Sequence, residues 1–330
     1  MTILLTGGAG FIGSHMAADL MSKGLDFLVL DNFSNSDRSN LNKLEVHFQK
    51  KIDICSCDLR DRDKLLDIFS KHNFESVIHF AALKSVPESI HNPKLYFDNN
   101  VGGSKNLMEM VKYFKITNFI FSSSATVYGE PQYLPIDESH PINSTSPYGQ
   151  TKIDTETLLL NDSYFSERCS TKILRYFNPV GAYLDGLIGE KPNGVPSNLM
   201  PYILGVAAGR YPLLKVFGDD YPTPDGTAIR DYVHVMDLID AHFLAMRHNV
   251  LGIVALNVGT GSGYSVLDLL HTFEKVNEIS IPFEIYPRRA GDSSSVFADT
   301  KKIQQLLGWS ATRDLRLMCQ EAFKFSKHSG

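Results

Sequence analysis

Cysteine is scarce in this chain of 330 residues, which contains only four. Four thiols cannot cross-link a fold of this size, so a disulfide-stabilised secreted domain is excluded and the reducing cytoplasm is the expected location. Cys55 and Cys57 are close enough in sequence to suggest a metal, but no second ligand pair follows them. In a strand, their spacing points both side chains to one face. We therefore expect these two cysteines to pack in a core, and we expect no structural metal.

Long apolar runs and an excess of positive charge are also lacking. No segment approaches the roughly 18 apolar residues that a membrane-spanning helix needs. Residues 1–6 lack the basic flank and the cleavage site of a signal peptide. Lys and Arg number 32 against 37 Asp and Glu, which gives a formal charge of −5. Because that charge creates no overall field to gather nucleic acid or an anionic membrane, we expect neither as a partner.

Short apolar runs alternate with helical patterns through the first half of the chain. The hydrophobic content of the whole chain, 43%, is too high for a disordered protein. Strands are expected at 3–6, 27–31, 52–57, 76–81, 119–123 and 172–177, and helices at 10–23, 61–71, 93–114 and 148–167. This order predicts an α/β fold of the Rossmann type, in which helices cover both faces of a doubly wound parallel sheet.

Turn residues gather after residue 179, which predicts a second, smaller α/β lobe for the substrate. We expect a cofactor domain over residues 1–179 and a substrate domain over residues 180–330. Within the second domain, the stretch 231–247 has the pattern of a strand followed by a helix. Part of 230–247 is therefore expected to pack on the first domain.

A glycine-rich segment over residues 6–13 joins the first expected strand to the first expected helix. Gly7, Gly10 and Gly13 permit a tight turn, a close approach of the backbone to a pyrophosphate and close packing of the helix on the strand. The N-terminus of the helix favours phosphate. Asp31 ends the second strand, where a carboxylate can accept hydrogen bonds from the ribose of adenosine. Because this carboxylate would repel a 2′-phosphate, the pattern predicts NAD rather than NADP.

A second motif places Tyr148 and Lys152 one turn apart on the same face of a helix. Ser124 follows another expected strand, at the edge of the sheet where ligands bind. A neighbouring ammonium group and the positive charge of an oxidised nicotinamide both favour a phenolate. Tyr148 can therefore act as a base toward an alcohol, with Ser124 hydrogen-bonded to the same hydroxyl and Lys152 also holding the nicotinamide ribose. These three residues form the predicted catalytic group.

These motifs resemble those of the extended short-chain dehydrogenase/reductases, and more narrowly those of the UDP-glucose/UDP-galactose 4-epimerases. The likeness extends over nearly the whole chain. Besides residues 6–13, it is carried by the segments 30–32, 77–81, 98–101, 119–129, 146–149, 174–181, 198–202, 230–238 and 287–292.

The resemblance implies an NAD-dependent isomerase that interconverts UDP-glucose and UDP-galactose with no net oxidation. Tyr148 would take the proton from the sugar O4 while the C4 hydride passes to NAD, giving a transient 4-keto sugar and bound NADH. The sugar would then turn and receive the hydride on its other face. Residues 1–179 would bind NAD and residues 180–330 would bind the UDP-sugar. The family commonly forms homodimers, so a homodimer is expected.

The resemblance also implies the binding residues, by position. The NAD site would be lined by Gly7, Gly10, Phe11, Ile12, Gly13, Asp31, Asn32, Asn35, Ser36, Asp58, Leu59, Phe80, Ala81, Lys84, Asn99, Tyr148, Lys152 and Phe177. The UDP-sugar would be held by Ser124, Tyr148, Asn178, Asn198, Leu199, Phe217, Arg230, Tyr232, Arg289, Asp292 and Val296.

Val296 is the departure from the family pattern that bears on specificity. Family members that are restricted to glucose and galactose typically have a tyrosine at this position, which closes the pocket near the C2 group of the sugar. Members with a small residue at this position admit an N-acetyl group. We therefore hypothesise that the chain also interconverts UDP-GlcNAc and UDP-GalNAc, the alternative being that Val296 is neutral packing beside a rearranged loop.

Three other functions remain as alternatives. A nucleotide-sugar 4,6-dehydratase shares the glycine loop, the Tyr and the Lys, but its relatives carry an Asp-Glu pair where this chain has Ala125 and Thr126. A 4-keto-sugar reductase would release NADP(H) in each turnover, whereas Asp31 favours NAD. A nucleotide-sensing protein without catalysis would not need Tyr148 and Lys152 beside a sugar-nucleotide lobe. The epimerase is the favoured interpretation.

Overall fold

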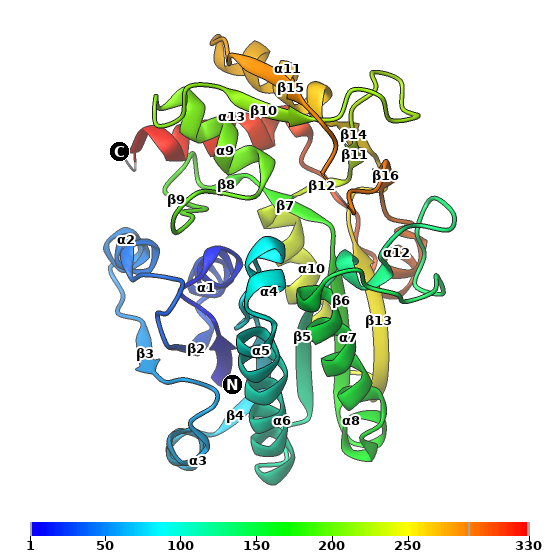
Figure 1. The fold of residues 1–330 in the computed structure, drawn as a ribbon. Coiled ribbons are helices and arrows are strands. Elements are labelled where there is room, and N and C mark those ends of the chain that lie inside the picture. Colours follow the sequence, from blue (N-terminus) through cyan, green and yellow to red (C-terminus); the bar gives the residue numbers. More distant parts are fainter. Residues whose placement is uncertain (1, 290, 329–330) are drawn as a thin grey trace. The chain divides into compact units, whose positions relative to one another are not determined.

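A seven-stranded sheet is the largest sheet of the protein. The computed structural model describes residues 2–289 and 291–328. The strand order is β13-β6-β5-β4-β1-β2-β3 (Figure 1). Pairing is parallel from β3 through β2, β1 and β4 to β5. The strands are β1 (Thr2–Thr6), β2 (Asp26–Asp31), β3 (Asp53–Ser56), β4 (Phe74–His79), β5 (Asn118–Ser124), β6 (Ser170–Tyr176) and β13 (Gly252–Val258). This order confirms the predicted doubly wound α/β fold, and the direction of winding reverses between β1 and β4.

Helices connect these strands, as the alternating pattern predicts. They are α1 (Phe11–Ser22), α2 (Ser39–Phe48), α3 (Arg62–Lys71), α4 (Val86–His91), α5 (Pro93–Tyr96), α6 (Gly103–Tyr113), α7 (Pro147–Leu160), α8 (Ser163–Glu167) and α10 (Val235–Arg247). Local sequence sets several of the starts. Asp61 accepts a hydrogen bond from the Lys64 amide at the start of α3, and Ser146 accepts one from the Gly149 amide at the start of α7.

Two expected helices are interrupted. The helix expected over 93–114 consists of α5, a π-helical segment (Phe97–Gly102) and α6. The widened turn places the Asn100 amide against the backbone nitrogen (2.8 Å) and oxygen (3.0 Å) of Leu83. The helix expected over 148–167 ends at Leu160, because Asp162 caps a new helix by accepting a hydrogen bond from the Tyr164 amide. Such side-chain contacts do not alter hydrophobic periodicity, which is why the pattern did not reveal them.

Apolar residues of the sheet and helices form a core that includes Leu4, Val77 and Phe119. Cys57 belongs to this core and Cys55 packs against it, which confirms the predicted packing of both thiols. Burial raises the pKa of Cys57 to about 11, so its thiol is not a thiolate at neutral pH. Within the described part of the chain, no group of His, Cys, Asp and Glu side chains has the arrangement of a metal site.

The chain divides into two compact units that are interleaved in sequence. Unit 1 comprises Met1–Gly129, Ile142–Arg175 and Ile239–Leu256, and unit 2 comprises Glu130–Pro141, Tyr176–Leu238 and Asn257–Gly330. The assignment of NAD binding to residues 1–179 and UDP-sugar binding to residues 180–330 stays a prediction. Among the described residues, no helix is long and apolar enough to cross a membrane.

Unit 2 is built from short strand pairs and helices around a core of its own, which includes Ile203, Leu269 and Met318. The pairs are β7 (Asn178–Val180) with β12 (Tyr232–His234), β8 (Ala182–Tyr183) with β9 (Ile188–Gly189), and β10 (Leu214–Phe217) with β15 (Phe283–Tyr286). A three-stranded sheet has β11 (Ile229–Arg230) between β14 (Tyr264–Ser265) and β16 (Ser295–Val296). The helices are α9 (Leu199–Ala207), α11 (Val266–Asn277), α12 (Lys301–Leu307) and α13 (Leu315–His328).

Candidate functional site

The glycine loop lies between β1 and α1 and leaves no room for side chains at two positions. Gly7 has φ +69°, and a Cβ there would lie 2.6 Å from the backbone nitrogen of Ala81. A Cβ on Gly13 would lie 2.3 Å from the Gly7 oxygen. Gly10 is the N-cap of α1, and within this fully described helix no acidic residue lies in the first turn. The cradle and the helix terminus therefore fit the pyrophosphate of a dinucleotide.

Asp31 at the end of β2 is 6% exposed and faces this loop. Its Oδ2 accepts a hydrogen bond from the Ala9 amide (3.0 Å). Its Oδ1 accepts from the Phe33 amide (2.9 Å) and the Ser36 hydroxyl (2.9 Å). The carboxylate thus ties the second strand to the glycine loop and to the predicted NAD residue Ser36. Its place next to the loop fits the predicted contact with an adenosine ribose.

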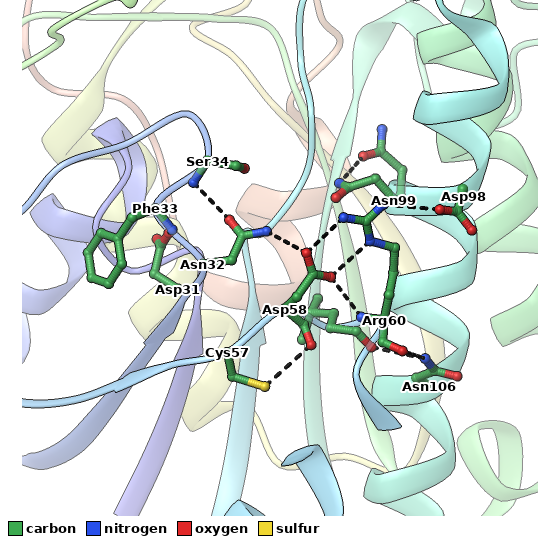
Figure 2. Close-up of polar contacts among 12 residues, drawn as sticks. Asp31, Asn32, Phe33, Ser34, Cys57, Asp58, Arg60, Asp98, Asn99 and Asn106 are labelled. Atoms are coloured by element: carbon green, nitrogen blue, oxygen red, sulfur yellow. Dashed lines mark hydrogen bonds and ion pairs between the residues drawn. The ribbon is translucent and has the colours of Figure 1, made fainter. Parts of the chain in front are cut away.

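Asp58, which follows β3, is the centre of a second polar group (Figure 2). Asn32 donates to its Oδ2 (2.9 Å), and the Arg60 guanidinium donates to both carboxylate oxygens (2.9 and 2.8 Å). The hydrogen bonds from Arg60 hold the pKa of Asp58 far below its ordinary value. Arg60 also donates to Asp98 (3.0 Å), in the π-helical segment that carries the predicted NAD residue Asn99. Arg60 was not among the predicted residues, and it holds the predicted residue Asp58 and the neighbour of Asn99, Asp98, in place.

The predicted catalytic group comes together in unit 1. Lys152 Nζ lies 5.9 Å from the centre of the Tyr148 ring and donates to the backbone oxygen of Ser122 (2.7 Å). Burial raises the pKa of Tyr148, and a hydrogen bond from Ser124 acts in the opposite direction. The Ser124 oxygen itself accepts from the amide (3.2 Å) and the hydroxyl (3.0 Å) of Thr126, which leaves its own proton to donate. The trio therefore has the contacts that proton transfer with an alcohol requires.

Lys152 is almost completely buried, and its charge depends on its surroundings. Burial lowers its pKa to about 8, and the nearby carboxylate of Glu156 raises the pKa. The ammonium group also lies 5.0 Å from the centre of the Phe121 ring. At neutral pH the side chain is therefore mostly protonated, as a partner for a phenolate must be.

A buried chain of hydrogen bonds connects β1 to α7. His79 bonds to Thr6 Oγ1 (2.7 Å) and to Ser104 Oγ (2.8 Å), and Ser104 Oγ donates to the Asn100 backbone oxygen. The Asn100 amide donates to Thr151 Oγ1 (3.1 Å), and Thr151 Oγ1 donates to the Tyr148 backbone oxygen (2.6 Å). The glycine loop and the tyrosine are thus linked through polar groups that are all satisfied, which makes their relative position well defined.

The other predicted NAD residues have these positions. Phe11 and Ile12 begin α1, Phe80, Ala81 and Lys84 follow β4, Leu59 follows Asp58, and Asn35 Nδ2 donates to the Ala82 oxygen (3.4 Å). Phe177 differs from the others because it belongs to unit 2.

Unit 2 carries most of the predicted UDP-sugar residues, in two sets. In the first, Arg289 Nε donates to Asp292 Oδ2 (2.9 Å), and Arg230 lies 4.0 Å from Asp292 Oδ1. The Arg289 guanidinium lies 4.8 Å from the centre of the Phe217 ring. Val296 is the register partner of Arg230 in the β11–β16 pair. Two arginines held in this way can bind a diphosphate with bidentate geometry.

The other predicted UDP-sugar residues of unit 2 lie on the β7–β12 pair and at the start of α9. Asn178 and Tyr232 are register partners. Asn198 is the N-cap of α9 and Leu199 its first residue.

Tyr221 and Arg288 join the arginine group although neither was among the predicted residues. The guanidinium of Arg288 lies 4.1 Å from the centre of the Tyr221 ring. The buried Tyr221 hydroxyl has no hydrogen-bond partner among the residues that the structure describes. Burial raises the pKa of Tyr221, and nearby Arg230 and Arg289 lower it. The pair Arg288-Arg289 was the only local signal for this clustering.

Comparison with known proteins gives one family. A family model described as GDP-mannose 4,6 dehydratase matches residues 4–322. The UDP-glucose 4-epimerases of Bacillus subtilis and Neisseria meningitidis serogroup B are 45% and 47% identical to this chain over 327 and 326 residues. Each alignment covers 98% of this chain and 96% of the relative.

A solved structure agrees with these sequence matches. The UDP-glucose 4-epimerase of Stenotrophomonas maltophila, crystallised with bound NAD and formylated UDP-arabinopyranose, has a TM-score of 0.96 and 43% identity. The match covers 99% of this chain and 98% of that structure. The likeness therefore includes both units and the whole length of the chain.

Proposed function

This chain belongs to the UDP-glucose 4-epimerase family, and we propose the chemistry by which its residues interconvert UDP-glucose and UDP-galactose. It is an NAD-dependent isomerase. The observation that carries the proposal is the grouping of Ser124, Tyr148 and Lys152 in unit 1, joined through buried hydrogen bonds to the glycine loop.

Tyr148 is the base toward the sugar O4 and returns the proton in the reverse half of the reaction. Ser124, whose oxygen is occupied by the Thr126 donors, donates its proton to the tyrosine oxygen or to the sugar hydroxyl. Lys152 supplies an ammonium on the same face of α7, which favours the phenolate. NAD, when bound, supplies the hydride acceptor for sugar C4 and a positive charge that favours the phenolate. Gly7, Gly10 and Gly13 hold its pyrophosphate and Asp31 its adenosine ribose.

Recognition of the substrate rests on its UDP part, because the hexose has to turn between the two half-reactions. Arg230 and Arg289 bind the diphosphate, and Asp292 accepts hydrogen bonds from the uridine ribose. The contacts of Asp292 with both arginines support this proposal, since they orient the guanidinium groups before the ligand arrives. Binding energy concentrated on the nucleotide leaves the sugar free to present either face.

A 4,6-dehydratase reaction is disfavoured by the residues that follow Ser124. That reaction needs an added acid and base toward C5 and C6 of the sugar. Ala125 has no ionisable group, and the Thr126 hydroxyl is bonded to Ser124 (3.0 Å). These two positions therefore support the serine and do not supply the second pair of proton-transfer groups.

We further propose that the chain accepts UDP-GlcNAc and UDP-GalNAc, because valine at position 296 leaves more room than tyrosine does. The register of Val296 with Arg230 supports a place for Val296 near the bound nucleotide sugar. The purified protein is expected to convert both UDP-galactose and UDP-GlcNAc. Val296→Tyr should lower kcat/KM for UDP-GlcNAc at least about tenfold and leave that for UDP-galactose nearly unchanged. NMR of the sugar anomeric protons measures both conversions.

The matched control for this substitution is Val250→Tyr, at a position in unit 1 that is 57% exposed and whose backbone oxygen accepts a hydrogen bond from Lys172. It adds the same side chain away from the proposed pocket and should change neither conversion. Absence of UDP-GlcNAc conversion by the unsubstituted protein would contradict the proposed breadth of substrate. So would a Val296→Tyr variant that converts both sugars equally well.

We also propose a cytoplasmic homodimer. The four cysteines are free thiols, which supports a reducing location. The homodimer is supported by the family resemblance and by the exposed apolar side chains of Ile90 on α4 and Leu95 on α5.

A further inference from the structure

A buried ion pair lies one helical turn beyond Lys152, among residues with no role in the proposed chemistry. The Arg175 guanidinium donates to both oxygens of Glu156 (3.1 and 2.6 Å), and Glu156 Oε1 also accepts from the Ser123 hydroxyl (2.5 Å). Arg175 donates in addition to the Tyr128 hydroxyl (3.0 Å) and lies 5.0 Å from the centre of that ring. Both charged side chains are at least 96% buried.

Such a pair is a costly element of a fold. Removing two charges from water carries a desolvation penalty that their attraction often fails to offset, and apolar residues of similar volume are frequently as stable. Stability alone therefore does not explain why Glu156 and Arg175 are present at this place.

The position of the pair points to the active site. Glu156 lies on α7, the helix that carries Tyr148 and Lys152, and Arg175 lies on β6. Ser123 is on β5, immediately before Ser124. The carboxylate of Glu156 thus joins the helix that carries two predicted catalytic residues to the strand that carries the third.

The charges around Lys152 give the pair a second effect. His79 on β4 is neutral, because burial and the charge of Lys152 lower its pKa to about 3. Phe121 and the Ser122 carbonyl on β5 contribute no net charge. Glu156 is the negative group that counteracts the effect of burial on Lys152, and Arg175 donates to both oxygens of that carboxylate.

We propose that Glu156 is a positioning residue of the active site. Held by Ser123 and Arg175, it fixes the end of β5 against α7 and provides the negative charge that keeps the Lys152 ammonium protonated. This inference rests on the proposed roles of Tyr148 and Lys152. Glu156 acts through Lys152 and does not contact the substrate.

Glu156→Gln tests the charge because it keeps an acceptor oxygen but leaves Arg175 without its counterion. Without the carboxylate, Lys152 should lose its proton at a lower pH. The alkaline limb of the pH profile of kcat for UDP-galactose should therefore shift to lower pH by about one pH unit or more. The ¹³Cε resonance of Lys152 should titrate at a correspondingly lower pH in the protein with its bound dinucleotide. This resonance is assigned by its absence from the spectrum of the Lys152→Met variant. Glu156→Asp keeps the charge, and its limb should stay near that of the unsubstituted protein.

The double variant Glu156→Met/Arg175→Met removes both charges at similar volume and is expected to fold. Its alkaline limb should lie between those of the unsubstituted protein and Glu156→Gln. If Glu156→Gln does not fold, the double variant tests the proposal. An alkaline limb shifted to lower pH supports the proposal, and an alkaline limb at its original pH overturns it. A limb and a Lys152 titration that stay unmoved in both variants, with only a lower melting temperature, would show that the pair is merely structural.

The proposed function is tested separately in the same assays. If Tyr148→Phe and Lys152→Met abolish turnover but the Glu156 variants keep the original limb, only the role of Glu156 is wrong. If Tyr148→Phe keeps full turnover, the catalytic assignment on which this inference rests is wrong.

Discussion

Replacement of Tyr148 by phenylalanine is expected to lower kcat for UDP-galactose by about 10²- to 10⁴-fold. The substitution removes only the hydroxyl that transfers the proton. The ring remains near Lys152, and the backbone of Tyr148 keeps its bonds with Ser89 (3.2 Å) and Thr151 (2.6 Å). The melting temperature and the amount of dinucleotide bound to the purified protein should therefore change little. Turnover is followed by NMR of the two UDP-sugars.

Tyr164→Phe is the matched control for this experiment. It removes a tyrosine hydroxyl from the same unit, one that donates to the Ile116 backbone oxygen (3.0 Å) at the other end of the sheet. Its kcat should equal that of the unsubstituted protein, although its stability falls by about 1 kcal/mol. A folded Tyr148→Phe variant with the kcat of this control would refute the assignment of Tyr148 as the base.

Gly7→Ala should have the second large effect, on cofactor binding and on stability together. The new Cβ would lie 2.6 Å from the Ala81 nitrogen and 2.7 Å from its Cα, and both are backbone atoms that cannot move away easily. Gly7 also has φ +69°, where a side chain is strained. We expect the backbone strain to lower the free energy of unfolding by about 1 kcal/mol, and the clash to lower it by a further ~1–3 kcal/mol. The displaced loop should lose most of the bound NAD.

Gly24→Ala separates strain from clash. Gly24 has φ +65°, nearly the same as Gly7, but nothing lies within 4 Å of the position that a Cβ would take there. This variant should show only the conformational strain and should keep its NAD. Chemical denaturation gives both free energies of unfolding, and absorbance of the dinucleotide released on denaturation gives the occupancy. Equal losses in the two variants would mean that the close approach of Gly7 to Ala81 is unimportant.

Much of this site could be predicted from sequence because its signals are local. The glycine loop needs three glycines close together and a helix start, and Tyr148 and Lys152 need only helical spacing. Asp31 is recognised because it ends a strand. The predicted strands of the large sheet are present in the structure, with ends that differ by a few residues.

The residues that support the site could not be predicted in the same way, because their partners are distant in sequence. Arg60 meets Asp98 across 38 positions, and Ser123 meets Glu156 across 33. Arg175 read alone is a strand residue of no evident role. Its pairing with Glu156 becomes visible only when α7 packs beside the sheet. The strand β13 was missed for a related reason, since it is far along the chain from the other strands of the large sheet, in and after the segment Ile239–Leu256 that returns to unit 1.

We propose that epimerisation proceeds by oxidation and reduction at the sugar C4, with Tyr148 moving the O4 proton. The most direct measurement uses UDP-galactose deuterated at C4, with the purified protein and no added dinucleotide. We expect the UDP-glucose formed to retain deuterium at C4 and none to be lost to water over many turnovers. Loss of deuterium to the solvent, or release of a keto sugar as the final product, would contradict it.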